Sequence, residues 1–161
     1  MASPTAWQTE RSFEQTNWRM LQDGTLCDVT FLVGNDIKEE VKAHKFILVS
    51  RSPVFYAMFC GSLAESSNTI QVPDIEPEIF REFIRFIYTE DCTVNGDNVL
   101  PLLYSAKKYE ASRLTEKCKE YLNTQLSIDN VCVILQHVHK SNEGELEKNV
   151  LSLFLRMGMT Y

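Results

Sequence analysis

The stretch that follows Pro77 constrains the fold of this chain most strongly. Its large apolar side chains recur with the helical period and cover more than one side of the predicted helix; they are Ile79, Phe80, Phe83, Ile84, Phe86 and Ile87. A helix with so wide an apolar surface is stable in water only when other elements cover most of it. Proline is favoured in a first helical turn, so Pro77 marks the start. The rest of the chain must therefore enclose this helix.

A β-hairpin is predicted ahead of it. The run Leu26–Val33 is rich in β-forming residues that alternate between two faces, with Val29, Phe31 and Val33 on one face and Thr30 and Leu32 on the other. Gly-Asn-Asp at 34–36 is a turn signal, and Ile37–Val41 is predicted as the returning strand.

Shorter elements are predicted around the long helix. They are helices Lys45–Val49 and Ser52–Phe59, a strand Thr69–Val72, and helices Asn98–Tyr109 and Ser112–Gln125. A hairpin followed mainly by helices predicts the α+β class.

Both ends of the chain also have helical patterns. The segment Trp7–Leu21 carries Trp7 and Trp18, which need a surface to cover them. N-cap signals at Ser127 and at 141–142 predict a further pair of helices with apolar stripes on both sides. We expect that pair to continue into helices beyond this chain.

The acidic charge is concentrated in one stretch. The 161 residues carry a formal net charge of −6, and residues 65–97, with eight acidic and two basic side chains, account for all of it. These acids are either solvated helix faces and turns or a face that attracts a basic protein partner. Because nucleic-acid binding needs a basic surface, we expect no DNA or RNA ligand.

Cysteine usage and hydropathy predict a soluble intracellular protein. The five cysteines contain no Cys-x-x-Cys pair, and no secretory signal precedes them, which favours a reducing compartment and buried apolar thiols. No apolar stretch approaches the roughly 20 residues of a membrane helix. We expect no membrane partner and a cytoplasmic location, with the nucleus as a second one.

The sequence predicts no enzyme, cofactor or metal. Motifs such as GxSxG, GxGxxG and HExxH are missing. His44 is expected to make a structural hydrogen bond. His137 and His139 stand two positions apart on a predicted helix, so they face different ways and do not readily share a metal. Cys60 has no adjacent base to activate it.

Three groups of residues together resemble a known family. The first group is Cys27–Phe31; the second is Ala43-His44-Lys45 with Leu48, Ser50, Ser52, Phe55, Met58 and Phe59; the third is Phe86–Thr89 with Ala106–Tyr109 and Leu114. In this spacing they resemble the BTB/POZ domain over roughly residues 20–126. The fold implied is a small β-sheet flanked by a helical cluster.

The resemblance also implies a domain organisation. Residues 1–22 would be an N-terminal dimerisation helix, residues 23–126 the BTB/POZ domain, and residues 127–161 the first helix pair of a truncated BACK region. The run Ser52–Glu65 and the residues Tyr104–Tyr109 look most similar to the BTB–BACK–PHR subgroup of cullin-3 adaptors, whose third domain this chain does not contain.

A homodimer interface is the first surface that the resemblance implies. The residues expected there are Trp18, Met20, Leu21, Asp28, Lys45 and Arg51. The N-terminal helix would pack on the partner subunit and bury its apolar residues. Asp28 stands in the position of the family's charged residue near the dimer seam, where Lys45 or Arg51 would pair with it.

The second implied surface would bind cullin-3 and make the chain a substrate adaptor of a ubiquitin ligase. Family members that bind cullin-3 carry a hydrophobic residue, any residue and Glu after the Met-Phe helix, and Leu63-Ala64-Glu65 matches. The expected contact residues are Tyr56, Met58, Phe59, Leu63, Glu65, Tyr88, Glu90 and Asp91. Phe59 could equally be ordinary core. The substrate protein would bind the missing C-terminal part.

A second function is compatible with the same family. A BTB/POZ dimer can serve a transcriptional regulator, with a corepressor peptide held in the groove at the dimer seam. The motif at 63–65 and the predicted helices after Ser127 favour the adaptor.

Overall fold

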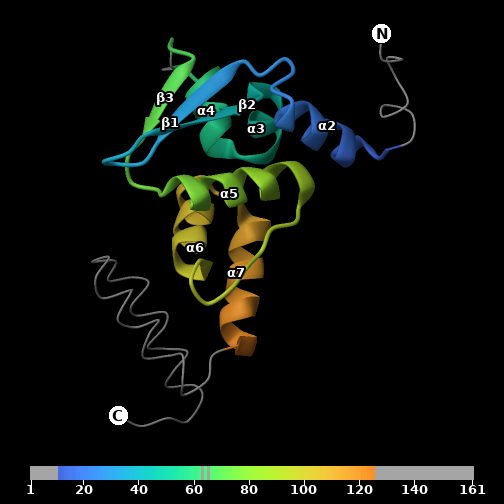
Figure 1. Ribbon diagram of the computed structural model, residues 1–161, viewed down its shortest axis with the longest axis vertical. Helices are drawn as coiled ribbons and strands as arrows, with labels where there is room; N and C mark the ends of the chain where they lie inside the picture. Colours follow the sequence, from blue (N-terminus) through green and yellow to red (C-terminus); the bar gives the residue numbers. More distant parts are fainter. Residues whose placement is uncertain (1–10, 63, 65, 126–161) are drawn as a thin grey trace.

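The computed structural model describes residues 11–62, 64 and 66–125 (Figure 1). Within them, a three-stranded sheet and six helices form the α+β fold that the sequence predicts. The predictions for Trp7, for Leu63 and Glu65, and for the helix pair after Ser127 lie outside the described residues.

The sheet is built around its middle strand. β1 (Val29–Val33) pairs antiparallel with β2 (Glu39–Ala43) and parallel with β3 (Thr69–Val72), in the order β2-β1-β3. Phe31 lies opposite Val41 on one side and Ile70 on the other. The alternation in β1 is confirmed, because its odd-numbered residues are buried and its even-numbered ones are half-buried.

The returning strand of the hairpin begins two residues later than predicted. Ile37 belongs to the turn, where its side chain is 78% exposed. Gly34 makes this turn possible with a φ of 107°, a backbone conformation that glycine adopts far more readily than other residues. The turn signal at 34–36 does not show how many residues the turn takes, so the prediction started the strand too early.

Two short helices follow the hairpin, α3 (Lys45–Arg51) and α4 (Pro53–Cys60). The buried Ser52 separates them: its hydroxyl accepts the Phe55 N–H and donates to the Tyr109 carbonyl. The predicted helices are thus confirmed with shifts of one or two residues at their ends. Ser52 also connects this part of the chain to the helices at the other end of the domain.

The long helix α5 (Pro77–Thr89) lies between the sheet with α3 and α4 on one side and the last two helices on the other (Figure 1). Its predicted enclosure is confirmed. Its buried rings Phe80 and Phe83 form a cluster with Phe31, Phe55 and Tyr109 from other parts of the chain. The closest centroids are those of Phe55 and Tyr109, 4.5 Å apart and stacked.

The N-terminal helix α2 (Phe13–Gln22) packs against the end of α5. It begins at a capping box in which Ser12 and Gln15 bond to each other's backbone N–H groups, rather than at Trp7. Trp18 is half-buried and meets Tyr88 edge-on, with 6.3 Å between ring centroids. Part of the burial that Trp18 needs thus comes from its own chain.

The chain continues through α6 (Val99–Lys108) and α7 (Ser112–Gln125), which pack against each other beyond α5 (Figure 1). Their bounds agree with the prediction to within one residue. Among the described helices, none combines the length and apolar character that crossing a bilayer requires.

Substitution of Gly34 tests the hairpin turn. In Gly34→Ala the new Cβ would collide with the Ile37 carbonyl oxygen, in a backbone conformation that alanine disfavours. We expect the free energy of unfolding, measured in urea, to fall by about 2 kcal/mol. Gly96→Ala is the matched control, because nothing lies within 4 Å of its new Cβ. Equal stability of the two variants would contradict this role of Gly34.

Candidate protein-interaction surfaces

His44 ties the start of α3 to two other elements. Its backbone N–H donates to the Tyr88 hydroxyl oxygen at 2.9 Å. The Tyr88 hydroxyl in turn donates its own proton to His44 Nδ1, which is 2.7 Å away. Nε2 then carries the ring proton and donates it to the Thr25 carbonyl at 2.7 Å. The predicted structural role of His44 is therefore confirmed, and the imidazole links α5 to the loop that follows α2.

Tyr88 does not lie on an exposed face with Tyr56. It is 6% exposed and sits between α2 and His44, and burial raises the pKa of its hydroxyl well above the ordinary value. The prediction that Tyr88 shares a contact face with Tyr56 and Met58 is not supported by this burial, because Tyr88, four positions after Ile84, extends the buried stripe of α5.

Asp28 and Lys45 meet, but not as an ion pair. The Asp28 carboxylate accepts the backbone N–H of Lys45 at 2.7 Å and so bonds to the first turn of α3. The Lys45 ammonium instead donates to the Asn68 side-chain carbonyl at 2.6 Å. Arg51 pairs with Glu90. Within the described part of the single chain, neither Lys45 nor Arg51 forms an ion pair with Asp28, and the pairing at a dimer seam stays a prediction.

Glu90 and Asp91 are neutralised by bases from other elements. Glu90 caps α5 in a left-handed conformation and pairs with Arg51 of α3 and Arg113 of α7. Asp91 pairs with Lys117 at 3.0 Å and Arg85 at 3.6 Å. The hydrogen bond from Arg51 chiefly lowers the pKa of Glu90, and the hydrogen bond from Lys117 that of Asp91.

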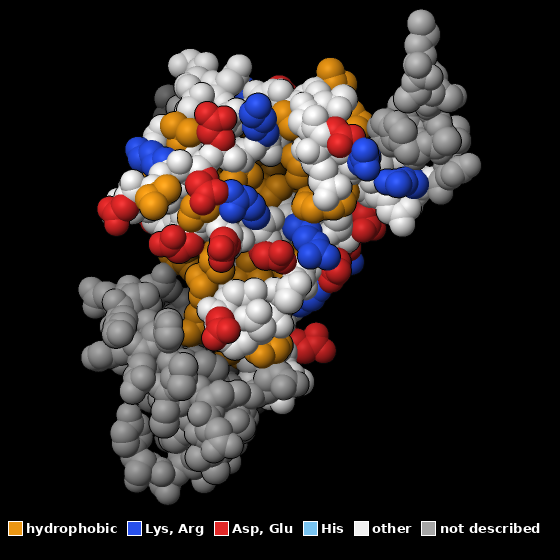
Figure 2. Space-filling view, viewed as in Figure 1, with side chains coloured by type: hydrophobic (Ala, Val, Ile, Leu, Met, Phe, Trp, Pro, Cys, Tyr) orange, Lys and Arg blue, Asp and Glu red, His pale blue; other side chains and the backbone are white. Residues whose placement is uncertain are grey.

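The acidic stretch is therefore not a uniformly acidic face. Four of its carboxylates have cationic partners: Asp74, Glu82, Glu90 and Asp91. Figure 2 shows acidic and basic side chains interleaved over one side of the molecule. Attraction of a basic partner by this stretch as a whole is not supported, because bases distant in the sequence fold back onto it.

The exposed end of α4 presents aromatic and apolar side chains. Tyr56 is 57% exposed, while Met58 and Phe59 are half-buried. Phe59 stacks on Phe55 with centroids 6.1 Å apart, so it belongs partly to the core. These three residues share one short helix, whereas Glu90 and Asp91 bond to α3, α5 and α7.

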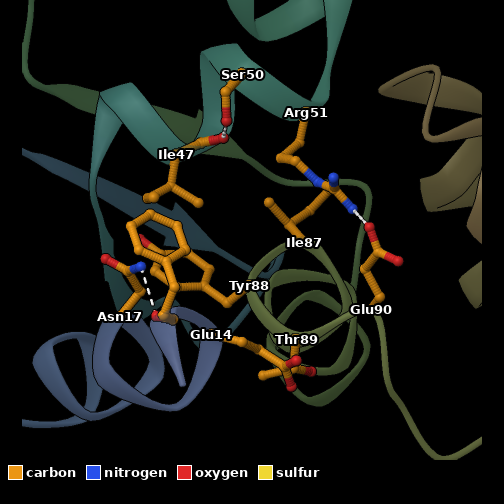
Figure 3. Close-up of a pocket in the computed structure, with 10 residues that line it drawn as sticks. Glu14, Asn17, Ile47, Ser50, Arg51, Ile87, Tyr88, Thr89 and Glu90 are labelled. Carbon is orange, nitrogen blue, oxygen red and sulfur yellow. Dashed lines mark hydrogen bonds and ion pairs between the residues drawn. The ribbon is translucent and has the colours of Figure 1, made fainter. Parts of the chain in front are cut away.

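A groove of about 210 Å³ lies between α2, α3 and α5 (Figure 3). Its apolar part includes Phe13, Ile47 and Ile87, and its rim carries polar groups such as Arg51 and Glu90. The predicted interface residues did not include Phe13 or Ile47, although Phe13 is a bulky apolar residue of the predicted N-terminal helix. The capping box at 12–15 was the available signal, because it places Phe13 in the first turn of a helix.

Three large apolar side chains on this end of the molecule are exposed: Phe13 (77%), Leu26 (79%) and Phe46 (75%). Leu26 also has a φ of 60°, which a non-glycine residue rarely adopts. Exposed apolar groups of this size often mark protein contacts. Their exposure was not predicted, since Phe13 and Leu26 were assigned to a helix and a strand, whose side chains pack on neighbouring elements.

A family model of the BTB/POZ domain matches residues 18–126. The chain belongs to the BTB/POZ domain family. It is 37% identical over 142 residues to BTB/POZ domain-containing protein 6 of Xenopus laevis, covering 87% of this chain and 27% of that protein. It is 38% identical over 136 residues to human BTB/POZ domain-containing proteins 6 and 3, with 84% of this chain covered.

The chain spans about a quarter of the length of these relatives, since it covers 25% and 26% of the two human proteins. Membership of this family supports a role as a protein-interaction module, and the matched proteins do not place the chain in an enzyme family. Among the described residues of this BTB/POZ domain, no three His, Cys, Asp or Glu side chains come close enough together to hold a metal ion.

The remaining predicted residues of the dimer interface lie on α2 of the BTB/POZ domain. Trp18, Met20 and Leu21 are half-buried within the single chain, and Trp18 and Leu21 pack against the core.

Two predicted buried thiols, Cys92 and Cys118, are confirmed as buried, and burial raises the pKa of Cys118 to about 12. Cys60 is exposed and Cys27 half-buried, while Cys132 lies outside the described residues.

Removal of the Tyr88 hydroxyl tests the junction at His44. Tyr88→Phe keeps the ring contact with Trp18 but leaves the His44 N–H and Nδ1 without their partner. We expect the free energy of unfolding in urea to fall by about 2 kcal/mol. Tyr56→Phe, which removes an exposed hydroxyl, should leave stability unchanged. Equal stability of wild type and Tyr88→Phe would contradict the assigned hydrogen bonds.

Proposed function

We propose that this BTB/POZ domain is the homodimeric adaptor domain of a cullin-3 RING ubiquitin ligase and binds the N-terminal region of cullin-3. The observation that carries the proposal is the exposed end of α4, where Tyr56, Met58 and Phe59 stand directly ahead of the segment with the Leu63-Ala64-Glu65 motif. Large, rigid side chains next to a polar group are typical anchors of a protein interface.

The proposed contacts divide between an apolar and a polar part. Leu63 would enter an apolar pocket of cullin-3 and Glu65 would bond to a polar group beside it; both lie outside the described residues. Tyr56 would cover the edge of that contact, because more than half of its surface is exposed to solvent. Glu90 and Asp91 take a secondary part, because each already has two cationic partners.

A homodimer is proposed for the end of the molecule formed by α2, α3 and the loop between α2 and β1. Phe13, Leu26 and Phe46 offer apolar surface there that nothing in the described part of the chain covers. Trp18 and Leu21 support this surface from within, because they hold α2 on the core. A second copy would bury the exposed residues around a two-fold axis.

Such a domain acts by proximity rather than by chemistry. It would hold the ligase scaffold on one side, while the substrate protein is bound by a part of the protein outside this chain. Other subunits would then transfer the ubiquitin, and the adaptor would raise the effective concentration of substrate beside them.

We propose a cytoplasmic location for the protein, with the nucleus as a second one.

The groove between α2, α3 and α5 favours a second candidate function (Figure 3). Its apolar floor and polar rim suit a peptide, as in a BTB/POZ dimer that binds a corepressor for a transcriptional regulator. The adaptor remains the leading proposal because of the motif that follows α4.

Calorimetric titration with the N-terminal region of cullin-3 tests the adaptor role. We expect submicromolar binding with one cullin per chain, weakened at least about tenfold in Glu65→Lys and in Leu63→Asp. Ile37→Asp is the matched control, because it places a charge at an exposed apolar position on the hairpin turn. A folded dimer that gives no binding signal would contradict the adaptor role and favour the corepressor candidate.

Substitution of Phe46 tests the dimer. Phe46→Glu places a charge in the proposed interface without removing core packing, so we expect monomers with unchanged thermal stability of the fold. Sedimentation equilibrium measures the mass, and Ile37→Glu, of similar exposure, should remain dimeric. A dimeric Phe46→Glu would contradict the proposed position of the interface.

A further inference from the structure

We propose that a hollow between the start of α5 and the loop before α6 is a docking site for an arginine side chain of a partner protein. The hollow has a volume of about 510 Å³, and its lining comes from the first two turns of α5 and from Asn95, Asp97 and Asn98. It shares no residue with the surfaces proposed for cullin-3 and for the dimer, so this inference goes beyond the proposed function.

Two carboxylates of the hollow have no basic partner. Among the described residues, no lysine or arginine forms an ion pair with Glu78 or Asp97, unlike four other acids of the same stretch. Arg81, the one base in the lining, already pairs with Glu39 of β2. The hollow therefore presents negative charge that the described part of the chain does not neutralise.

The lining also offers an apolar contact and two ordered walls. Ile79 lines the hollow and packs partly against the core. Asn95 Oδ1 accepts the backbone N–H of Asp97 at 3.0 Å, so Asp97 stands on an ordered turn. Glu82 of α5 holds the same loop by accepting the Thr93 N–H at 3.0 Å. Little ordering of the walls is then left to oppose the binding of a partner.

The hairpin between β1 and β2 extends this surface on one side. Its turn lies against Pro77, because a Cβ at Gly34 would touch the proline ring, and Glu39 bonds to Arg81 in the lining. Ile37 on this turn is 78% exposed. A large apolar side chain beside a charged hollow suits contact with a protein rather than with a small ion.

Arginine fits this combination of charge and apolar surface better than other cations. Its planar guanidinium has five N–H donors and can bond to two carboxylates, while its methylene stem covers apolar surface. A metal ion is not favoured, because no three His, Cys, Asp or Glu side chains of the described residues gather closely enough to hold one. Figure 2 shows acidic side chains beside apolar surface at the height of α5.

Nuclear magnetic resonance titration with acetyl-arginine amide tests the site. We expect saturable shifts confined to the amides of residues 78–82 and 95–98. Acetyl-citrulline amide, which has a similar shape but no charge, should not bind at the same concentrations. The affinity for acetyl-arginine amide should fall about threefold in Glu78→Gln or Asp97→Asn and about tenfold in the double variant. Glu120→Gln, which removes an exposed carboxylate of α7, is the matched control and should bind as the wild type does.

Three outcomes of this titration would overturn the proposal: shifts spread over exposed carboxylates everywhere, equal binding of the two probes, or wild-type affinity in the double variant. The comparison of the two probes uses the wild-type chain, so it decides the question even if a variant fails to fold. Sedimentation equilibrium tests a second copy of this chain as the occupant. The double variant should keep the wild-type mass, and a lower mass would assign the hollow to contact between copies and overturn docking of a partner protein.

Discussion

The stacking of aromatic rings around α5 is the interaction on which the rest of this domain depends. Phe31 of β1, Phe55 of α4 and Tyr109 after α6 all contact rings of α5, with centroids between 5.1 and 6.3 Å apart. A single cluster thus joins the sheet, the short helices and the C-terminal helices. Burial of large aromatic side chains is among the strongest contributions that one residue makes to stability.

This rigid centre determines what the surface offers to a partner. Because Phe55 is fixed in the core, Phe59, one turn further along α4, stacks on it and is half-buried, while Tyr56 stays in solvent. Because Tyr88 is bonded to His44, α2 and the loop after it stand at a defined place beside α3. The proposed cullin surface and the proposed dimer surface are therefore two sides of the same core.

Local elements were predictable where a short-range pattern decides them. The strand Thr69–Val72 has the predicted bounds, and the enclosed helix after Pro77 was clear from its apolar period. The start of β2 was not predictable, because the turn signal at 34–36 does not show how many residues the turn takes, and Ile37 lies in the loop. A turn signal marks a reversal of the chain, and it does not report where the hydrogen-bonded ladder begins.

By itself, the sequence established the α+β class, the order of the elements, most of the core and the resemblance to the BTB/POZ family. Periodicity suffices for these because burial repeats with the geometry of each helix or strand. Only the tertiary structure decided which polar groups meet. Arg51 and Glu90 are 39 residues apart, and Lys45 reaches Asn68 rather than the Asp28 carboxylate. Such partners depend on how whole elements pack, and no local spacing encodes the distance between two side chains on different elements.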